Sequence, residues 1–120
     1  PAKPEYMMVV RLTASAIACR ADFCMDDIED LKVAVAEACI MLMHQGHSPN
    51  SLNIVFQIQT NEALKIDITV EDPAPTDIEP KSETERELGL FILESLIDEI
   101  EMETENDKIY RISMYKRCGG

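Results

Sequence analysis

The segment from residue 25 to residue 45 constrains the fold most, because its apolar residues repeat with the period of an α-helix. It reads MDDIEDLKVAVAEACIMLMHQ. Its apolar side chains at i, i+3, i+7, i+10 and i+14 form one stripe, made of Ile28, Leu31, Val35, Ala38 and Leu42. We expect Asp26, with Glu29 as the reciprocal carboxylate, to cap the start of this helix, and Gly46 to end it. Other elements of the chain must then pack on this stripe.

A second line of side chains on the same helix is the place where we expect any chemistry. Glu37, Met41 and His44 follow one another at i, i+4 and i+7, beside the apolar stripe. Two interpretations of Glu37 stay open: it is a functional carboxylate, or it is an ordinary carboxylate on a solvated face of the helix. No cation lies at i±3 or i±4 to pair with it, which favours the first.

Metal and disulfide roles find little support in the sequence. The four cysteines form no CxxC pair, and no Cys-His cluster has the spacing of a zinc site. His44 and His47 lack further ligands, so we expect no metal there. Cys39 falls within the central helix and is predicted to be a small core residue.

Length and charge narrow the class of protein. The 120 residues suit one domain, spanning residues 1–120, with one core. No segment is long and apolar enough to cross a bilayer, and no signal peptide is visible, so we expect a cytoplasmic protein. A net charge of −12 disfavours nucleic acid and anionic membranes as partners. The acidity favours a basic partner protein, or serves only to keep the chain in solution.

The segments on either side predict a small sheet and two more helices. We expect a strand over residues 6–10 and a helix over residues 11–23. The inward face of that helix is predicted to hold Leu12, Ala16, Cys19 and Phe23. Strict alternation then predicts two strands, over residues 52–58 and 64–70, joined by a hairpin turn. Pro73-Ala74-Pro75 is expected to end the second strand.

The C-terminal third is predicted to add a helix and a hairpin. Residues 76–84 are polar and are expected to form a loop. A third helix is predicted over residues 87–97, with an inward face of Leu88, Phe91, Ile92 and Leu96. Strands over residues 99–103 and 109–115 form the hairpin, and residues 116–120 a frayed tail. The expected fold is therefore an α/β two-layer sandwich, with three helices on one face of a mixed, mostly antiparallel sheet.

Three stretches of the chain resemble a known family. They are PAKPEYMMVVRLTASAIACRADFCMDDIEDLKVAVAEAC at residues 1–39, VEDPA at residues 70–74 and ELGLFILESLIDEIEME at residues 87–103. They resemble the anti-sigma-factor serine kinases of bacterial partner switching, which belong to the GHKL (histidine kinase-like) ATPase superfamily. The resemblance implies the same sandwich, ATP and Mg²⁺ as cofactors, and a homodimer. It also implies a sigma factor and an anti-anti-sigma protein as partners, with Arg11 on the partner-facing surface.

The resemblance also assigns roles to the matching residues. Glu37 matches the family's catalytic glutamate, which orients or deprotonates the attacking group. Asp72 matches the aspartate that binds the adenine amino group, and Gly89 matches a glycine of the phosphate-binding turn. Met41 stands where the family has the asparagine that holds Mg²⁺, and a thioether cannot supply the hard oxygen ligand that this ion requires.

Other departures from the family pattern point the same way. Pro73-Ala74-Pro75 replaces a glycine-containing turn, and Arg86-Glu87-Leu88-Gly89 keeps one glycine while adding a carboxylate near the expected phosphates. We therefore expect an anti-sigma-like regulator that binds proteins, whose ATP binding and kinase activity are weakened or lost. The alternatives are an active ATP-dependent serine/threonine kinase acting on an anti-anti-sigma factor, and a degenerate subunit that pairs with an active homologue.

Overall fold

The structure, a computed structural model, describes residues 4–45, 47–59, 63–75 and 82–117, without the side chains at positions 4, 47–50 and 72–75. A short 3₁₀ turn at Pro4–Tyr6 leads into the first helix. The elements that follow are α1 (Met7–Arg20), α2 (Met25–Met43), β1 (His47–Gln59), β2 (Ala63–Pro75), α3 (Glu83–Leu96), β3 (Glu99–Glu105) and β4 (Lys108–Arg117).

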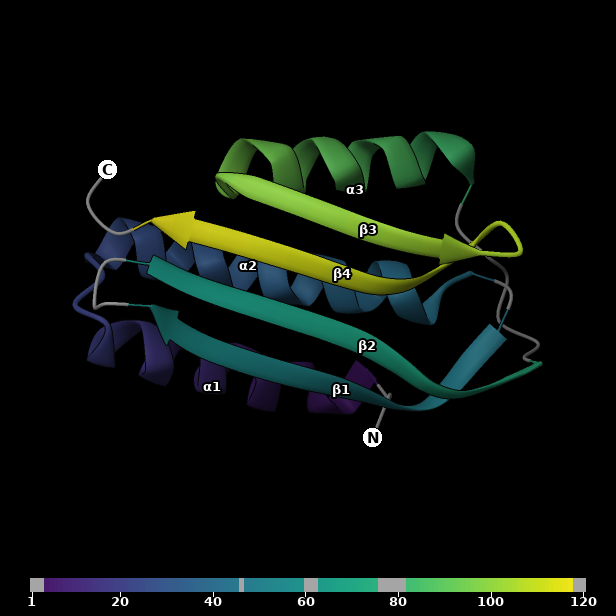
Figure 1. The fold of residues 1–120 in the computed structure, drawn as a ribbon, viewed down its shortest axis with the longest axis horizontal. Helices are drawn as coiled ribbons and strands as arrows, with labels where there is room; N and C mark the ends of the chain where they lie inside the picture. The colour runs from purple at the N-terminus through teal and green to yellow at the C-terminus, as the bar shows by residue number, and fades with distance from the viewer. Residues whose placement is uncertain (1–3, 46, 60–62, 76–81, 118–120) are drawn as a thin grey trace.

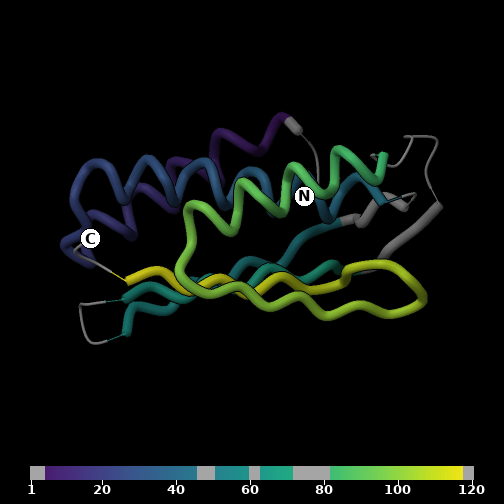
Figure 2. The backbone as a smooth tube through the Cα atoms, turned by 90° about the horizontal axis from the view of Figure 1, so that it is seen from above, coloured from purple at the N-terminus to yellow at the C-terminus, as the bar shows by residue number. Residues whose placement is uncertain are grey.

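The four strands form one antiparallel sheet in the order β1-β2-β4-β3. All three α-helices lie on one face of this sheet, and the described part of the chain leaves the other face bare (Figure 1, Figure 2). The expected α/β two-layer sandwich is confirmed. None of the described helices is long and apolar enough to cross a membrane.

The α2 helix lies at the centre of the helical layer, and its predicted stripe forms the middle of the core. All five stripe residues are buried. Burial also raises the pKa of the Cys39 thiol to about 12, as expected for a small core residue. The predicted cap was wrong by two positions. The helix begins at Met25, so Cys24 occupies the N-cap position, and its Sγ donates to Asp27 Oδ2 at 3.3 Å. The helix ends at Met43, and Gly46 lies outside the described residues.

The N-terminal segment forms α1, and the strand predicted over residues 6–10 was wrong. The predicted inward face was wrong as well, because Leu12, Ala16 and Cys19 are exposed. The buried positions of this segment are Met7, Ala14, Ala18, Ala21 and Phe23. Apolar residues surround this helix on nearly every side, so periodicity alone could not select the buried face. The alanines allow α1 to lie close against α2, where a larger side chain would hold the helices apart.

Strands β1 and β2 follow the predicted alternation except at Ile58 of β1, which was predicted to face inward and is exposed. Leu64, Ile66 and Ile68 of β2 are fully buried, and Ile54 pairs with Ile68 across the β1–β2 ladder. Pro73-Ala74-Pro75 does not end the strand, contrary to expectation, because β2 stays paired with β1 as far as Pro75. The pairing between β2 and β4 stops at Thr69, so this end of β2 is an edge, where proline is tolerated.

The C-terminal hairpin is tighter than predicted. Asn106 and Asp107 form its two-residue turn, and both have positive φ angles, 53° and 64°. These are the residue types and backbone angles of a type I′ hairpin turn. On the bare face of the sheet, Arg111 Nη2 lies 2.7 Å from Asp67 Oδ1. Partial burial opposes ionisation of Asp67, but hydrogen bonds from Ser113 and Arg111 outweigh it and lower the pKa of this carboxyl.

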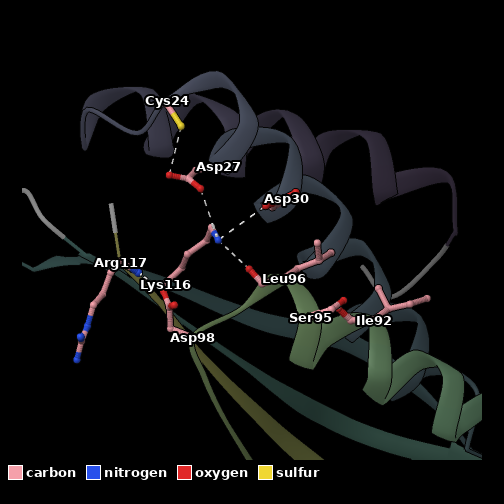
Figure 3. Close-up of polar contacts among 9 residues, drawn as sticks. All are labelled: Cys24, Asp27, Asp30, Ile92, Ser95, Leu96, Asp98, Lys116 and Arg117. Atoms are coloured by element: carbon pink, nitrogen blue, oxygen red, sulfur yellow. Dashed lines mark hydrogen bonds and ion pairs between the residues drawn. The ribbon is translucent and has the colours of Figure 1, made fainter. Parts of the chain in front are cut away.

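Lys116 was predicted to lie in a frayed tail, and that prediction was wrong. It is the second-to-last residue of β4, and its side chain is buried among three elements (Figure 3). Its Nζ donates to the carbonyl oxygen of Leu96 at 2.8 Å and lies 3.7 Å from Asp27 Oδ1 and 3.9 Å from Asp30 Oδ2. The last described residue, Arg117, donates its backbone N–H to Asp98 at 2.6 Å.

Candidate functional site

Glu37 and Met41 lie one turn apart on α2, on the side that faces α3. Glu37 is half-buried, and Met41 is buried. Their neighbour on α3 is Gly89: a Cβ atom on this residue would lie 2.7 Å from Glu37 Oε1 and 3.3 Å from Met41 Sδ. The structure therefore brings together three of the residues that the sequence analysis singled out, as a direct contact between two helices.

The position at which α3 begins explains why the stretch around Gly89 is helical. Ser82 is the N-cap, and its Oγ accepts a hydrogen bond from the backbone N–H of Glu85 at 3.1 Å. The helix then runs from Glu83, so the predicted start at residue 87 was wrong. Residues 83 and 84 of the predicted loop are helical, and residues 76–81 lie outside the described residues. The stretch from Arg86 to Gly89, expected as an open turn, is helical. Glutamate, arginine and leucine all favour a helix, so the helix that begins at the Ser82 cap continues through this stretch.

This early start changes what the backbone can bind. The first N–H groups of a helix have no partner within it, while later ones bond to the carbonyl four residues earlier. Gly89 is the seventh residue of α3, so its N–H belongs to the helix interior. The first turn holds Glu83 and Glu85, and the exposed Glu87 follows. These carboxylates take the favourable position near the helix N-terminus that a phosphate would otherwise occupy.

Met41 shapes the chemistry of the site as much as Gly89 does. Its thioether packs in the core beside Glu37, and a soft sulfur is a poor ligand for Mg²⁺. The third member of the line, His44, is the half-buried C-cap of α2. Among the residues that the structure describes, no group of three or more His, Cys, Asp or Glu side chains is placed to hold a metal ion.

Two further predicted site residues, Asp72 and Arg11, are not part of this contact as the structure describes it. The side chain of Asp72 lies outside the described residues, so its contact with adenine stays a prediction. Arg11 is exposed on α1 and forms no hydrogen bond or ion pair with the described residues. It sits beside the exposed side chains of Met8 and Leu12.

Two exposed apolar surfaces were not expected from the sequence. On α1, Met8, Val9 and Leu12 are each more than half exposed. On α3, Leu88 and Phe91 were predicted to face inward and instead face solvent, while Gly89 and Leu93 are buried. A signal for α3 was present in the sequence: Gly89, Leu93 and Leu96 share one face at i, i+4 and i+7, and a glycine on an apolar line often marks close helix packing.

A hollow of about 200 Å³ lies on the bare face of the sheet. It is lined by Gln59, Lys65, Glu99, Glu101, Ser113 and Tyr115. These residues come from all four strands, and the helices cover the opposite face (Figure 2). The hollow is therefore separate from the contact between Glu37 and Gly89.

Three helices over a four-stranded antiparallel sheet, with a glutamate of the central helix set against a glycine of the next, define an α/β two-layer sandwich with a contact between its second and third helices. The chain belongs to the histidine kinase-like ATPase domain family, whose model matches residues 1–116. It is 33% identical over 130 residues to the serine-protein kinase RsbW of Oceanobacillus iheyensis, covering 96% of this chain and 82% of that protein. It is 30% identical over 131 residues to the protein of the same name from Bacillus velezensis, covering 96% and 81%. The family resemblance stated from the sequence is confirmed.

Proposed function

We propose that this protein is an anti-sigma-like regulator of bacterial transcription that acts by binding proteins and has lost Mg·ATP binding. Its partner is a sigma factor or an anti-anti-sigma protein, and a cytoplasmic location follows from that role. The similarity to the serine-protein kinases RsbW supports the regulatory class. The loss of nucleotide binding rests on one observation: the backbone of α3 at Gly89 packs directly on Glu37 and Met41.

Three features of the site oppose nucleotide binding. Phosphate binding needs unpaired N–H groups at a helix start, and those near Gly89 are inside α3. Phosphoryl transfer needs a metal ion to neutralise developing charge, and Met41 offers that ion no oxygen. Finally, Glu83, Glu85 and Glu87 repel the phosphates of a nucleotide. Each of these three features weakens nucleotide binding, and all three act on the phosphate groups of the nucleotide.

The second candidate function is an active serine/threonine kinase that phosphorylates an anti-anti-sigma factor. Two observations favour it: the relatives carry the name serine-protein kinase, and Glu37 is present on α2. In this alternative Glu37 is catalytic, ATP and Mg²⁺ are the cofactors, and Asp72 and Gly89 contact the nucleotide.

Isothermal titration of ATP with Mg²⁺ into the purified protein tests the proposal, with ADP in a parallel run. We expect no saturable heat up to millimolar nucleotide. Saturable binding would overturn the loss of nucleotide binding. Labelled phosphate transferred from ATP to a serine of a partner protein, and abolished by Glu37→Ala, would establish the kinase instead.

The α1 helix is our candidate for the contact between two copies. It contains no acidic residue, carries Arg11 and Arg20, and exposes the apolar side chains of Met8, Val9 and Leu12. A two-fold axis beside α1 would bury these side chains against their equivalents in a second copy. Arg11 stays our candidate for docking a partner from this side of the molecule.

A further inference from the structure

The outward side of α3 carries apolar side chains that the core does not use. Leu88 is 59% exposed and Phe91 is 66% exposed. Ile92, one turn after Leu88, is half-buried and does not belong to the core cluster. Burial of a large aromatic side chain is among the strongest contributions to protein association, so an exposed Phe91 is a candidate anchor.

The contact between Gly89 and Glu37 brings apolar residues of α2 to the same place. Val33 and Ile40 lie at i−4 and i+3 from Glu37, so they share its side of α2, and Val33 is 50% exposed. The two helices run antiparallel, because Lys116 joins the C-terminal end of α3 to Asp27 and Asp30 near the start of α2 (Figure 3). Val33 therefore lies level with Ile92, and Ile40 level with the first turns of α3. We call these five residues the α2–α3 apolar surface: Val33, Ile40, Leu88, Phe91 and Ile92. Ile40 is half-buried and also packs against the core, so it lies at the inner border of this surface.

Acidic residues flank this surface on the side of α3 away from α2. Glu87 and Glu94 are both exposed and lie seven residues apart on one line of the helix, or about 10.5 Å. Neither forms a hydrogen bond or ion pair within the described part of the chain. The whole helix holds four glutamates against one arginine. An apolar stripe thus runs beside an acidic one.

The charge of α3 selects among possible occupants. Two copies of the same acidic surface would bring like charges together, which disfavours self-association here. Anionic lipid and nucleic acid are disfavoured for the same reason. A partner helix with an apolar face bordered by lysine or arginine can contact the apolar and the acidic stripe together. Its basic residues at i and i+7 would be spaced like Glu87 and Glu94.

We propose that the α2–α3 apolar surface, with Glu87 and Glu94, binds an amphipathic basic helix of a partner protein. Phe91 and Leu88 are its apolar anchors, and the two glutamates speed the encounter and exclude acidic partners. The proposal rests on the proposed protein-binding function, since it names the surface that performs it. It is independent of α1, whose exposed face carries no acidic residue.

A designed peptide probe tests the surface directly. The probe is a fluorescent 18-residue helix with leucine at i, i+3, i+4 and i+7 positions and lysine pairs seven residues apart, and its control replaces each lysine by glutamate. Fluorescence anisotropy at 50 mM and 300 mM salt should show saturable binding of the basic peptide, weakened by salt, and none of the acidic one. Phe91→Ser and the double variant Glu87→Lys/Glu94→Lys should each weaken binding by about tenfold or more. Met25→Ser, at a residue that is 70% exposed at the start of α2 and belongs to neither apolar surface, is the matched control and should leave binding unchanged.

Several results would overturn the proposal. One is the absence of binding by the basic peptide; another is binding that Met25→Ser weakens and Phe91→Ser does not. A third is a dimer of the wild-type protein that Phe91→Ser converts to monomer, because the occupant would then be a second copy. Amide chemical shifts report the site independently of the variants, and we expect the peptide to shift α3 and the outward side of α2. Titration of Mg·ATP into the wild-type protein separates the two proposals, since nucleotide binding would overturn the function proposed above without affecting the peptide result.

Discussion

Gly89 is the residue whose packing carries most of the functional argument. A glycine in the middle of a helix costs stability relative to alanine, so its presence in α3 calls for a packing reason. The reason is the close approach of Glu37: a Cβ atom at position 89 would lie only 2.7 Å from Glu37 Oε1. A residue that resembles part of a phosphate-binding turn in the sequence thus serves, in the structure, as the point of closest approach between α2 and α3.

A double-mutant cycle between positions 37 and 89 tests this contact. Gly89→Ala alone should change the free energy of unfolding by less than about 0.5 kcal/mol, because the helix-propensity gain of about 1 kcal/mol is offset by displacement of the Glu37 carboxylate. In a Glu37→Ala background the same substitution should stabilise by up to about 1 kcal/mol. Urea unfolding measures both. Glu94→Ala is the control background, and an equal effect of Gly89→Ala with and without Glu37 would refute the contact.

At the scale of elements, Lys116 joins three parts of the fold. Its strand ends beside the start of α2 and the end of α3. Its Nζ donates to the carbonyl oxygen of Leu96, the last residue of α3, to which no later N–H of the helix donates (Figure 3). The side chain of Lys116 is only 10% exposed, and that of Asp27 only 13%. An ion pair this far from solvent is costly to break, because the remaining carboxylate then has no cation beside it and keeps only the weak hydrogen bond from Cys24 Sγ.

Lys116→Met should therefore destabilise the protein by about 1–3 kcal/mol. The methionine keeps the apolar part of the side chain, so the loss reports the charge and the hydrogen bond to Leu96. Lys32→Met is the matched control, because its i,i+3 pair with Glu29 is more exposed, and we expect it to cost at most about 0.5 kcal/mol. Thermal or urea unfolding at pH 7 measures both variants, and equal losses would contradict the role of Lys116.

At the scale of the whole molecule, charge is distributed unevenly among the helices. The chain has a net charge of −12, yet α1 has two arginines and no acidic residue, while α3 has four glutamates and one arginine. The two exposed apolar surfaces therefore differ in the partners that they favour. The α1 surface carries no carboxylate and so does not favour a basic partner, whereas the α2–α3 apolar surface, with its flanking glutamates, does.

We expect the protein to sediment as a dimer at micromolar concentration and Leu12→Glu to sediment as a monomer. The substitution places a carboxylate within the apolar stripe of α1, and a buried unpaired charge opposes association. Sedimentation equilibrium measures the change. Phe91→Ser is the control and should stay dimeric; a monomeric wild type, or a dimer unaffected by Leu12→Glu, would remove α1 as the contact between copies.

The sequence by itself determined the elements whose residue pattern is compatible with only one local structure. The stripe from Ile28 to Leu42 and the alternation of β2 both agree with the structure, because local periodicity admits few alternatives. The family, and with it the two-layer architecture, also followed from the residues alone.

Only the tertiary structure decided which faces are buried where a helix is apolar on several sides. Leu12, Leu88 and Phe91 were predicted to face inward and face solvent, because small residues beside them, Ala14 and Gly89, allow a closer approach between helices. The burial of Lys116 depends on three segments that are distant in the sequence, so no local pattern could reveal it. The direct contact of Gly89 with Glu37 and Met41 likewise arises from packing between helices, and the proposed function rests on that contact.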